Sequence, residues 1–434
     1  MNSTINLDAL KEAASSDREL AYKMRAMSGV VRIELPSQAI DFEFDNGRLV
    51  TVREAESTAA VTISAGEDFW TKALSANPGR GYESLTMAMQ VGATVEGDFA
   101  GVIAPYQPGL QRLYRVFVDY AGTPVPRAPY SNPFRDTDNA VGRYVYVTAN
   151  DAEARIYYET AGNGPIPLLL QATAGADGRQ YRHLLADPAM QSRFTMYAYD
   201  LPFHGKSLPP TGVRWWEQAY LPGREYLENW VVAIADALKL DQPYFMGCSV
   251  GGQLALDLAA DHGDRFGAFV SLNGWYDNPG VPEGYSNDLF RTPSISAEYA
   301  PALNFGATAP SAPEEYAHEV YFIYRSNFPG IYAGDNDYFM YEHNLAVNGH
   351  NIDARRKPVY VIAGEYDPAS FDQEHGGPAV EAKIDGAVFI ETPRLGHFAI
   401  SDDPIGFSEA IVPILDKVIA QAQASKADRT EAQR

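Results

Sequence analysis

The residues that most clearly suggest chemistry lie in the run Gly247-Cys248-Ser249-Val250-Gly251-Gly252. An apolar run at 244–246 precedes it and a helical pattern follows, so Ser249 is expected at a sharp turn between a strand and a helix. The glycines leave room for that turn, which would project the serine hydroxyl above the sheet. The helix after the turn would offer its first N–H groups, with that of Val250 among them, to an oxyanion. This pattern predicts a nucleophilic serine.

A serine hydroxyl is a weak nucleophile, and it needs a base that is oriented by an acid. Asp367 follows the apolar strand pattern that ends near residue 363, and His397 follows the next strand pattern, around 389–390. The order serine, aspartate, histidine along the chain is one that known catalytic triads use. We therefore predict that His397 takes the proton of Ser249 through one ring nitrogen while Asp367 holds the other.

Other titratable side chains are weaker candidates for these roles. Glu365 lies close to Asp367, but side chains alternate along a strand, and the loop after the strand favours Asp367. Asp277 follows an earlier strand and is a less suitable acid. No pair of side chains has the spacing of metal ligands, so neither a metal nor a cofactor is predicted. His204 is expected to be a structural histidine in a loop. His183 and His262 are expected at the surface or at helix caps.

The elements that must position these residues alternate between apolar runs and helical patterns. A hairpin around Tyr144 and Ile156 begins this part of the chain, and helical patterns cover 226–238 and 250–262. Short apolar strands that alternate with helices predict an α/β fold, in which a mostly parallel sheet is covered on both faces. In such sheets the functional residues collect at the carboxyl ends of the strands. The apolar runs lie at 166–170, 194–199, 244–246, 268–272 and 359–363.

From about residue 144 to residue 420 the chain resembles the α/β-hydrolase superfamily. The resemblance rests on the Gly-x-Ser-x-Gly motif, on the order of the three predicted catalytic residues, and on Tyr199-Asp200-Leu201-Pro202-Phe203-His204-Gly205-Lys206-Ser207. The last run is similar to the family's loop after its fourth strand. Epoxide hydrolases and haloalkane dehalogenases share this fold but use an aspartate as the nucleophile. The serine at this position therefore argues against these two activities.

The same resemblance implies an oxyanion hole after an earlier strand. Members commonly carry His-Gly there, whereas this chain reads Leu170-Gln171-Ala172-Thr173-Ala174-Gly175, without a histidine. Backbone amides do this work, so the departure need not abolish activity. The resemblance implies the amide of Ala174, with Thr173 as the neighbouring candidate, together with the amide of Val250.

The first 118 residues show a different pattern. A helical stretch at 8–27 precedes four strand patterns of period two, and Asp45-Asn46-Gly47 predicts a hairpin between two of them. Further helices are expected at 68–74 and 82–89, which predicts a small α+β domain. Residues 8–117 resemble the sterol-carrier-protein-2-like (SCP2-like) domain, through the run 61–64 before a helix and through Val95-Glu96-Gly97-Asp98. That resemblance implies an apolar pocket for a fatty or sterol-like ligand, and the alternative is a dimerisation or scaffolding unit.

Composition changes mark the remaining boundaries. Residues 119–140 are rich in Pro, Gly, Ser, Asn and Asp and are expected to be a linker, and 421–434 are polar and are expected to be a flexible tail. The hydrolase-like domain is therefore predicted at 141–420, with a cap at about 274–356. Aromatic residues are frequent in the cap and favour a pocket for an apolar or aromatic substrate. The residues that we expect to bind this substrate are Trp275, Tyr276, Tyr324 and, beside the predicted base, Phe398.

The overall composition narrows the classes of partner. A net charge of -22 argues against nucleic acid, and no stretch approaches the ~20 apolar residues that span a bilayer. The chain has one cysteine and no recognisable signal sequence, so a cytoplasmic protein is expected, and a homo-oligomer is plausible.

These observations favour hydrolysis of a hydrophobic or aromatic ester or lactone through an acyl-enzyme on Ser249. A C–C bond hydrolase that acts on a ketone or diketone would use the same residues, and acyl transfer to another acceptor is a third possibility. The alternatives of another class are a non-catalytic ligand sensor and a lipid-carrier module.

Overall fold

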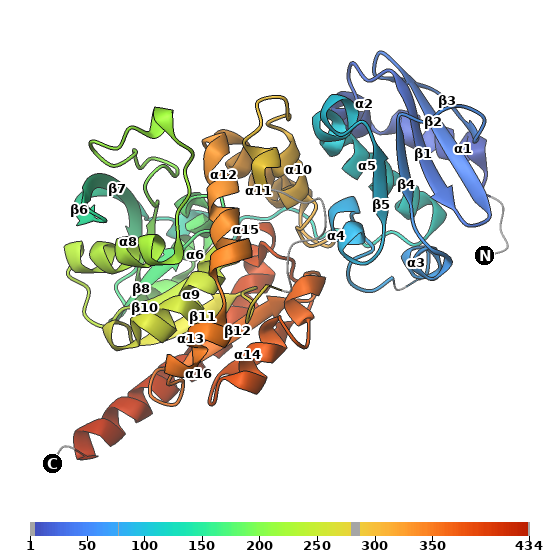
Figure 1. The fold of residues 1–434 in the computed structure, drawn as a ribbon. Helices are drawn as coiled ribbons and strands as arrows, with labels where there is room; N and C mark the ends of the chain where they lie inside the picture. The colour runs from blue at the N-terminus through green and yellow to red at the C-terminus, as the bar shows by residue number, and fades with distance from the viewer. Residues whose placement is uncertain (1–4, 77, 279–286, 433–434) are drawn as a thin grey trace.

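A computed structural model of the chain describes residues 5–76, 78–278 and 287–432 and shows two domains (Figure 1). The first domain is a five-stranded sheet with the strand order β3-β2-β1-β4-β5, in which β1 and β4 are parallel and the other pairs are antiparallel. Its elements are α1 (Leu7–Ser16), α2 (Arg18–Lys23), β1 (Gly29–Leu35), β2 (Gln38–Asp45), β3 (Arg48–Glu54), β4 (Val61–Ser64), α3 (Glu67–Ala73), α4 (Leu85–Gln90), β5 (Thr94–Gly97) and α5 (Ala104–Ala121).

The predicted hairpin is present between β2 and β3. Asn46 (φ 47°) and Gly47 (φ 85°) both have positive φ, as the tight turn between twisted strands requires. The single helix predicted at 8–27 is instead two helices. The chain breaks at Asp17, which is extended and whose side chain accepts a 2.7 Å hydrogen bond from the amide of Leu20 and so caps α2.

Helix α5 was not predicted from the sequence. Pro108 and Gly109 lower its intrinsic helix propensity, but one side of the helix is buried in the domain core. That core contains Trp70, Tyr114 and Phe117, so the packing of α5 outweighs its weak propensity. The helix continues to Ala121, which places the start of the connecting segment a few residues beyond residue 118.

The second domain is built around an eight-stranded sheet with the order β13-β12-β11-β10-β8-β9-β7-β6. The strands from β9 to β13 in this order pair in parallel, and only the β6–β7 and β7–β9 pairs are antiparallel, which confirms the predicted mostly parallel sheet. Its elements are β6 (Val141–Ala149), β7 (Ala152–Ala161), β8 (Ile166–Gln171), α6 (Arg182–Ala186), α7 (Pro188–Arg193), β9 (Phe194–Tyr199), α8 (Arg224–Ala237), β10 (Tyr244–Cys248), α9 (Val250–Asp261), β11 (Ala268–Leu272), α10 (Tyr299–Phe305), α11 (Glu314–Ser326), α12 (Pro329–Asp337), α13 (Leu345–Asn348), β12 (Val359–Gly364), α14 (Gly377–Lys383), β13 (Val388–Thr392), α15 (Ala399–Asp402) and α16 (Pro404–Ala432).

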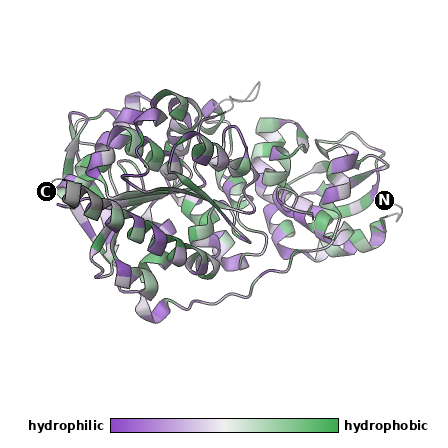
Figure 2. Ribbon diagram, turned by 90° about the horizontal axis from the view of Figure 1, so that it is seen from below, coloured by the Kyte–Doolittle hydropathy of each residue, from purple (hydrophilic) through white to green (hydrophobic). Residues whose placement is uncertain are grey.

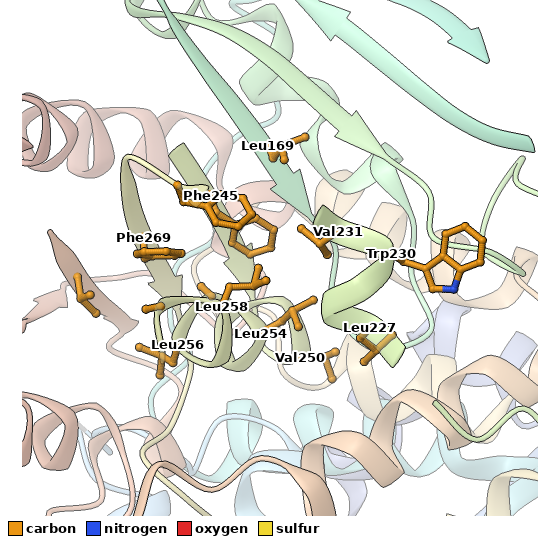
Figure 3. Close-up of a cluster of buried hydrophobic side chains, with 14 of the residues drawn as sticks. Leu169, Leu227, Trp230, Val231, Phe245, Val250, Leu254, Leu256, Leu258 and Phe269 are labelled. Carbon is orange, nitrogen blue, oxygen red and sulfur yellow. The ribbon is translucent and has the colours of Figure 1, made fainter. Parts of the chain in front are cut away.

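Helices cover both faces of this sheet. On one face α8 and α9 pack against β10 and β11, and Figure 3 shows Val231 and Leu254 beside Phe245 and Phe269. On the other face α6, α7 and α16 bury a second cluster of apolar side chains against the same strands. This arrangement places the carboxyl ends of the central strands at one edge of the sheet, where the loops that follow them meet.

The cap comprises α10, α11, α12 and α13, between β11 and β12, and it lies next to the first domain (Figure 1). An extended segment joins the two domains and packs on the cap, where the amide of Ala128 donates to the carbonyl of Ser311 (2.8 Å). The described ends of the chain lie at opposite ends of the molecule (Figure 2). Helix α16 runs past residue 420 to Ala432, so the predicted boundary at 421 falls inside a helix, and residues 433–434 lie outside the described part. None of the described helices is long and apolar enough to cross a membrane.

Candidate active site

Ser249 stands at the turn from β10 into α9 with φ 57° and ψ −114°, a strained conformation for a residue with a side chain. Three glycines make this turn possible. A Cβ on Gly251 would lie 2.6 Å from the carbonyl oxygen of Gln171, and one on Gly252 would lie 2.5 Å from that of Leu272. A Cβ on Gly247 would collide with the backbone of Gly251. The tight approach of the helix to its neighbouring strands therefore explains the glycines of the motif.

The predicted acid and base are joined by a hydrogen bond. Nδ1 of His397 lies 2.6 Å from Oδ2 of Asp367, which follows β12 and is buried. Glu365 has another partner, because its Oε2 accepts from the amide of Arg394 (2.7 Å). Asp277 is hydrogen-bonded to His375 instead. Of the acids considered from the sequence, Asp367 is the one that the structure brings to His397.

Backbone contacts hold the histidine loop beside the serine. The carbonyl oxygen of His397 accepts hydrogen bonds from Sγ of Cys248 (3.2 Å) and from Nδ2 of Asn273 (2.9 Å). Cys248 directly precedes Ser249, so Ser249 and His397 lie on segments that contact each other. In the described part of the chain the Ser249 hydroxyl has no hydrogen-bond partner, and its residue is only 8% exposed. Hydrogen bonds between nucleophile and base are often looser in the absence of substrate.

The loop after β8 approaches the same turn. The amide of Thr173 donates to Oε1 of Gln180 (3.0 Å), and the amide of Gly175 donates to Oδ2 of Asp335 (2.7 Å). Between them, the amide of Ala174 has no partner among the described residues. Thr173 is thus the less suitable of the two predicted oxyanion donors, because its N–H is already engaged. Ala174 remains the candidate of this loop, with Val250 at the first position of α9 as the other.

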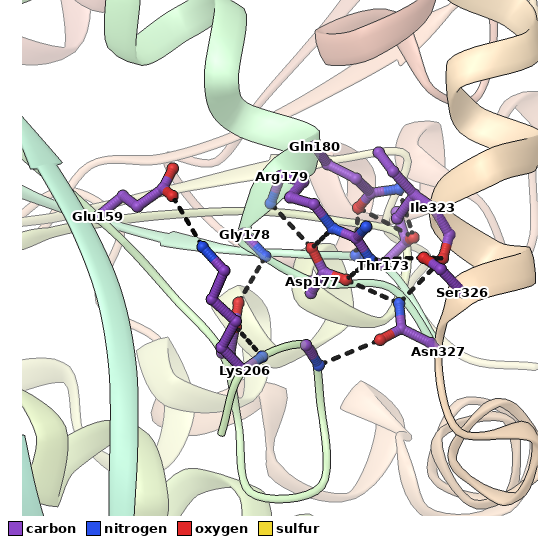
Figure 4. A network of polar contacts seen from close by, with 12 residues as sticks. Glu159, Thr173, Asp177, Gly178, Arg179, Gln180, Lys206, Ile323, Ser326 and Asn327 are labelled. Carbon is purple, nitrogen blue, oxygen red and sulfur yellow. Dashed lines mark hydrogen bonds and ion pairs between the residues drawn. The ribbon is translucent and has the colours of Figure 1, made fainter. Parts of the chain in front are cut away.

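A network of polar contacts keeps this loop in place (Figure 4). Oδ1 of Asp177 accepts from Nε of Arg179 (2.7 Å), and its Oδ2 accepts from Nδ2 of Asn327 (2.8 Å) at the end of α11. Asp200, at the end of β9, accepts from the amides of Gly178 (2.8 Å) and Lys206 (2.7 Å). Burial and the neighbouring Asp177 raise the pKa of Asp200 to about 7. The cap and two loops of the sheet therefore share one set of hydrogen bonds.

His204 belongs to this region and has a structural position. Its ring is buried, with Nε2 2.8 Å from Oδ2 of Asp335 and Nδ1 2.9 Å from the carbonyl oxygen of Pro202. Burial alone would lower the pKa of His204, but Asp335 raises it above the ordinary value. The same Asp335 oxygen holds the amide of Gly175, so the residue links the loop after β9 to the candidate oxyanion loop.

His262 and His183 were both expected at the surface or at a helix cap, and only His262 has such a position. His262 is the C-cap residue of α9, in agreement with the sequence, and its pKa is raised through a hydrogen bond with Glu228. His183 was expected at the surface or at a cap, but it is only 2% exposed. It lies in α6 with its ring 4.6 Å from that of Tyr316 of the cap. The packing of the cap on α6 buries it, and no local sequence signal marks that contact.

The four predicted substrate-binding residues fall into two groups. Tyr324 and Phe398 are buried together, with ring centroids 5.7 Å apart, and the Tyr324 hydroxyl is hydrogen-bonded to Oγ1 of Thr173. Trp275 lies on the side of the acid, where its Nε1 donates to Oγ of Ser370 (3.3 Å). Tyr276 is part of the core beside α8 and α9, and the ammonium group of Lys383 lies over its ring. Tyr324 and Phe398 therefore lie in a buried cluster beside the loop after β8, Tyr276 lies in the core of the sheet domain, and substrate contact by any of the four residues stays a prediction.

The first domain contributes to the wall behind this site. Met87 of α4 belongs to one cluster of buried apolar side chains with Tyr324, Phe398, Ala172 and Ala176. Nearby, Oγ of Ser84 donates to the carbonyl oxygen of Gly306 in the cap (2.5 Å). Sequence reasoning assigned no site residue to this domain, because only the tertiary contact brings Met87 to the loop after β8.

One group of side chains at the boundary between the first domain and the cap has a geometry that could hold a metal ion. The potential ligand atoms of Glu19, Glu314 and His318 lie within 4.8 Å of one another. Glu19 and His318 already bond to each other, with Oε1 2.9 Å from Nε2. Burial would raise the pKa of Glu19, but the hydrogen bonds from His318 and Lys23 lower it. Lys23 and Arg112 also pair with Glu19, so Glu19 and His318 form part of an ion-paired contact between the first domain and the cap.

The mostly parallel sheet, covered by helices on both faces and with Ser249 at a strand-to-helix turn, defines a class of protein by its fold. Residues 166–404 match the family model of the alpha/beta hydrolase fold, and the chain belongs to that family.

Curated relatives have several activities in their names. A 2-hydroxy-6-oxononadienedioate/2-hydroxy-6-oxononatrienedioate hydrolase of Cupriavidus pinatubonensis is 27% identical over 168 residues, which cover 37% of this chain and 56% of that protein. The chain thus spans just over half the length of that relative. RutD of Caulobacter vibrioides, which is named for carbamate hydrolysis, is 25% identical over 289 residues, 60% of this chain and 95% of that protein.

Solved structures show the same fold. An esterase from Thermogutta terrifontis matches with a TM-score of 0.52 and 18% identity, over 64% of this chain and 99% of that one. An enol-lactonase from Burkholderia xenovorans matches with a TM-score of 0.51 and 21% identity, over 63% of this chain and 99% of that one. The first domain lies outside the family match.

Proposed function

We propose that the chain is a serine hydrolase of hydrophobic or aromatic carboxylic esters or lactones, with Ser249, His397 and Asp367 as its catalytic triad. The observation that carries this proposal is the 2.6 Å hydrogen bond between Asp367 and His397, on a loop that Cys248 fastens beside the serine turn. A base that is oriented by a buried acid next to a strained serine is the arrangement needed for nucleophilic catalysis.

In the proposed reaction the oxygen of Ser249 attacks the carbonyl carbon while Nε2 of His397 takes the hydroxyl proton. The negative charge moves to the carbonyl oxygen, where the amides of Val250 and Ala174 stabilise it. The tetrahedral intermediate collapses when the bond to the alcohol oxygen breaks, and His397 returns the proton to that oxygen. Water, activated in turn by His397, then hydrolyses the acyl-enzyme and releases the carboxylic acid.

A C–C bond hydrolase is the second candidate, and the names of the relatives from Cupriavidus pinatubonensis and from Burkholderia vietnamiensis support it. The same three residues would serve, with a ketone carbonyl in place of the ester. A non-catalytic sensor is the alternative of another class, and the partnered Asp367 and His397 argue against it.

We also propose that the first domain is an SCP2-like unit. Two roles fit it: carriage of an apolar ligand, and support of the cap. The contact of Met87 with the apolar cluster behind the site supports the second role.

The proposal is tested by labelling with a fluorophosphonate probe and by turnover of p-nitrophenyl esters of increasing chain length. The parent should be labelled and active, and Ser249→Ala should lose both properties. Ser192→Ala is the matched control, because this serine lies in α7 with an exposed hydrogen bond to its own helix. Turnover of diketones without ester turnover would favour the C–C hydrolase, and a parent that neither labels nor turns over any of these substrates would favour the sensor.

A further inference from the structure

Two adjoining cavities lie under the cap, between the helices of the cap and the segment that follows β9. The outer cavity has a volume of about 710 Å³ and the inner one about 260 Å³. Phe290, Arg291 and Phe328 line both, so the cavities share a wall. Their volumes together are in the range of pockets that hold small organic ligands. A third cleft, of about 420 Å³, lies at the far end of α9 from Ser249 and is lined by polar side chains such as Asp264.

The inner cavity ends at the candidate oxyanion loop. Gly175 and Tyr324 form part of its lining, and Gly175 directly follows Ala174, whose amide is free. Tyr324 is hydrogen-bonded to Thr173, and its ring lies 5.7 Å from that of Phe398, the neighbour of His397. Ser249 and His397 are not among the described residues that line either cavity, so a molecule in the two cavities would have one end at the loop that carries the candidate oxyanion amide.

Aromatic rings form part of the wall of each cavity. Tyr332 and Phe290 meet edge to face with ring centroids 4.8 Å apart, and Trp215 meets Phe328 in the same way at 5.7 Å. Tyr220 adds a further ring to the lining of the outer cavity. Such walls bind apolar and aromatic groups through buried area and ring contacts.

The charged side chains in these walls are already neutralised. Among the described lining residues, Arg291 and Arg325 carry positive charge. Arg291 is paired with Asp337 and also with Asp288 (2.9 Å), and Nε of Arg325 is 2.7 Å from Oε1 of Glu298. One donor is left, because Nε of Arg291 is buried without a hydrogen-bond partner among the described residues. The charge of each arginine is nevertheless balanced by paired acids, so a carboxylate that entered would lose hydration beside like charges.

We infer that these two cavities bind the uncharged, apolar or aromatic part of the substrate and discriminate against substrates that carry a carboxylate. The inference rests on the proposed function and narrows its substrate class. It separates this chain from the relatives that are named for dienedioates, because a dienedioate carries two carboxylates. It also assigns a role to Arg291: because two aspartates pair with its guanidinium group, its charge is not available to pair with a ligand.

The test is a binding measurement on the inactive Ser249→Ala protein with two ligands of matched size, dimethyl terephthalate and its monomethyl ester. The diester is uncharged and the monoester is an anion at neutral pH. Calorimetry should show the diester binding at least about 10-fold more tightly than the monoester, as expected when a charge enters a site without a partner. Equal affinities, or tighter binding of the monoester, would overturn the inference.

Variants test where the ligand binds and which charges determine the selectivity. Phe328→Ala should weaken binding of the diester by about 5-fold or more through loss of aromatic contact, whereas Tyr146→Ala, an exposed ring on β6, should not. Asp337→Asn should release the charge of Arg291 and improve binding of the monoester relative to the diester by about 5-fold or more. Asp288→Asn changes an exposed side chain and repeats this test with little risk to folding.

Unchanged selectivity in both aspartate variants, or unchanged binding in Phe328→Ala, would contradict the inference. Because binding is measured without catalysis, such a failure is distinct from failure of the proposed function. The latter would appear as turnover that does not depend on Ser249.

Discussion

The hydroxyl of Ser370 donates a 2.7 Å hydrogen bond to Oδ2 of Asp367, the same oxygen that lies 2.6 Å from Nδ1 of His397. Ser370 in turn accepts from Nε1 of Trp275 (3.3 Å), and the carbonyl oxygen of Trp275 is 2.8 Å from Nε2 of His343. All of these groups lie at the acid side of the site. The orientation of Asp367 is therefore held by residues from three separate segments of the chain.

Replacement of Ser370 by alanine should lower kcat/KM by about 10-fold, because a hydrogen bond to an ionised carboxylate contributes about 1.5–3 kcal/mol. The loss of this donor leaves Asp367 less firmly oriented toward His397, so the effect should fall on kcat rather than on KM. Trp275→Phe removes the longer and more remote bond, so a smaller effect is expected. A kcat that does not change in Ser370→Ala would show that the serine only fills space.

Asp335→Asn should lower the free energy of unfolding by an amount that depends on pH. Asp335 raises the pKa of the buried His204 above its ordinary value of 6.5. The stabilisation from this pair is fully present below pH 6.5 and is lost as the pH rises through the folded-state pKa of His204. The difference in unfolding free energy between parent and variant, from urea titrations, should therefore be largest in mild acid and should shrink in alkali. A difference that is independent of pH would contradict the pairing.

Asp402→Asn should show the same direction of pH dependence, but over a lower pH window. Burial raises the pKa of Asp402 from 3.8 to about 7, while Oδ2 accepts a 2.6 Å hydrogen bond from the amide of Ala309. The protonated form is favoured in the folded state, so the contribution of Asp402 to stability is lost as the pH rises from 3.8 through about 7. The variant should gain stability relative to the parent over that window, by up to about 1.4 kcal/mol per pH unit.

Asp385→Asn is the control for this experiment, since its side chain is exposed. Thermal unfolding at several pH values gives the comparison. A parent and an Asp402→Asn variant that respond equally to pH would show that Asp402 is ionised in the folded protein.

Gly306→Ala should weaken the contact between the cap and the first domain. A Cβ at this position would lie 2.5 Å from Nε2 of Gln111 and still closer to Oγ1 of Thr86. Overpacking of this kind costs about 1–3 kcal/mol, so the midpoint of unfolding should fall. Gly263→Ala is the matched control, because nothing lies within 4 Å of its added Cβ. If both variants unfold like the parent, the two domains do not depend on this contact.

Local sequence patterns were sufficient for the elements with strong periodicity. Four of the five strands of the first sheet and the Asn46-Gly47 turn follow from side-chain alternation and from residues that accept positive φ. Most of the parallel strands of the second sheet follow from short apolar runs. The turn at Ser249 follows from the glycines, because the approach of the backbone is a local steric requirement. The choice of Asp367 over Glu365 as partner of His397 could also be predicted, since a strand end limits which side chain can reach the next loop.

Contacts between distant segments decided what the sequence could not. Asp335 reaches Gly175 across 160 residues, and this bond, together with the one from Thr173 to Gln180, leaves Ala174 as the free amide of its loop. Helix α5 forms in spite of Pro108, because its apolar side is buried in the core of the first domain. The sequence by itself determined the fold class, the strand-to-helix turn and the order of the candidate catalytic residues, because these depend on periodicity and local sterics. Only the tertiary structure decided which amide, which aromatic side chains and which charges face the site, because these depend on packing between segments that are far apart in the chain.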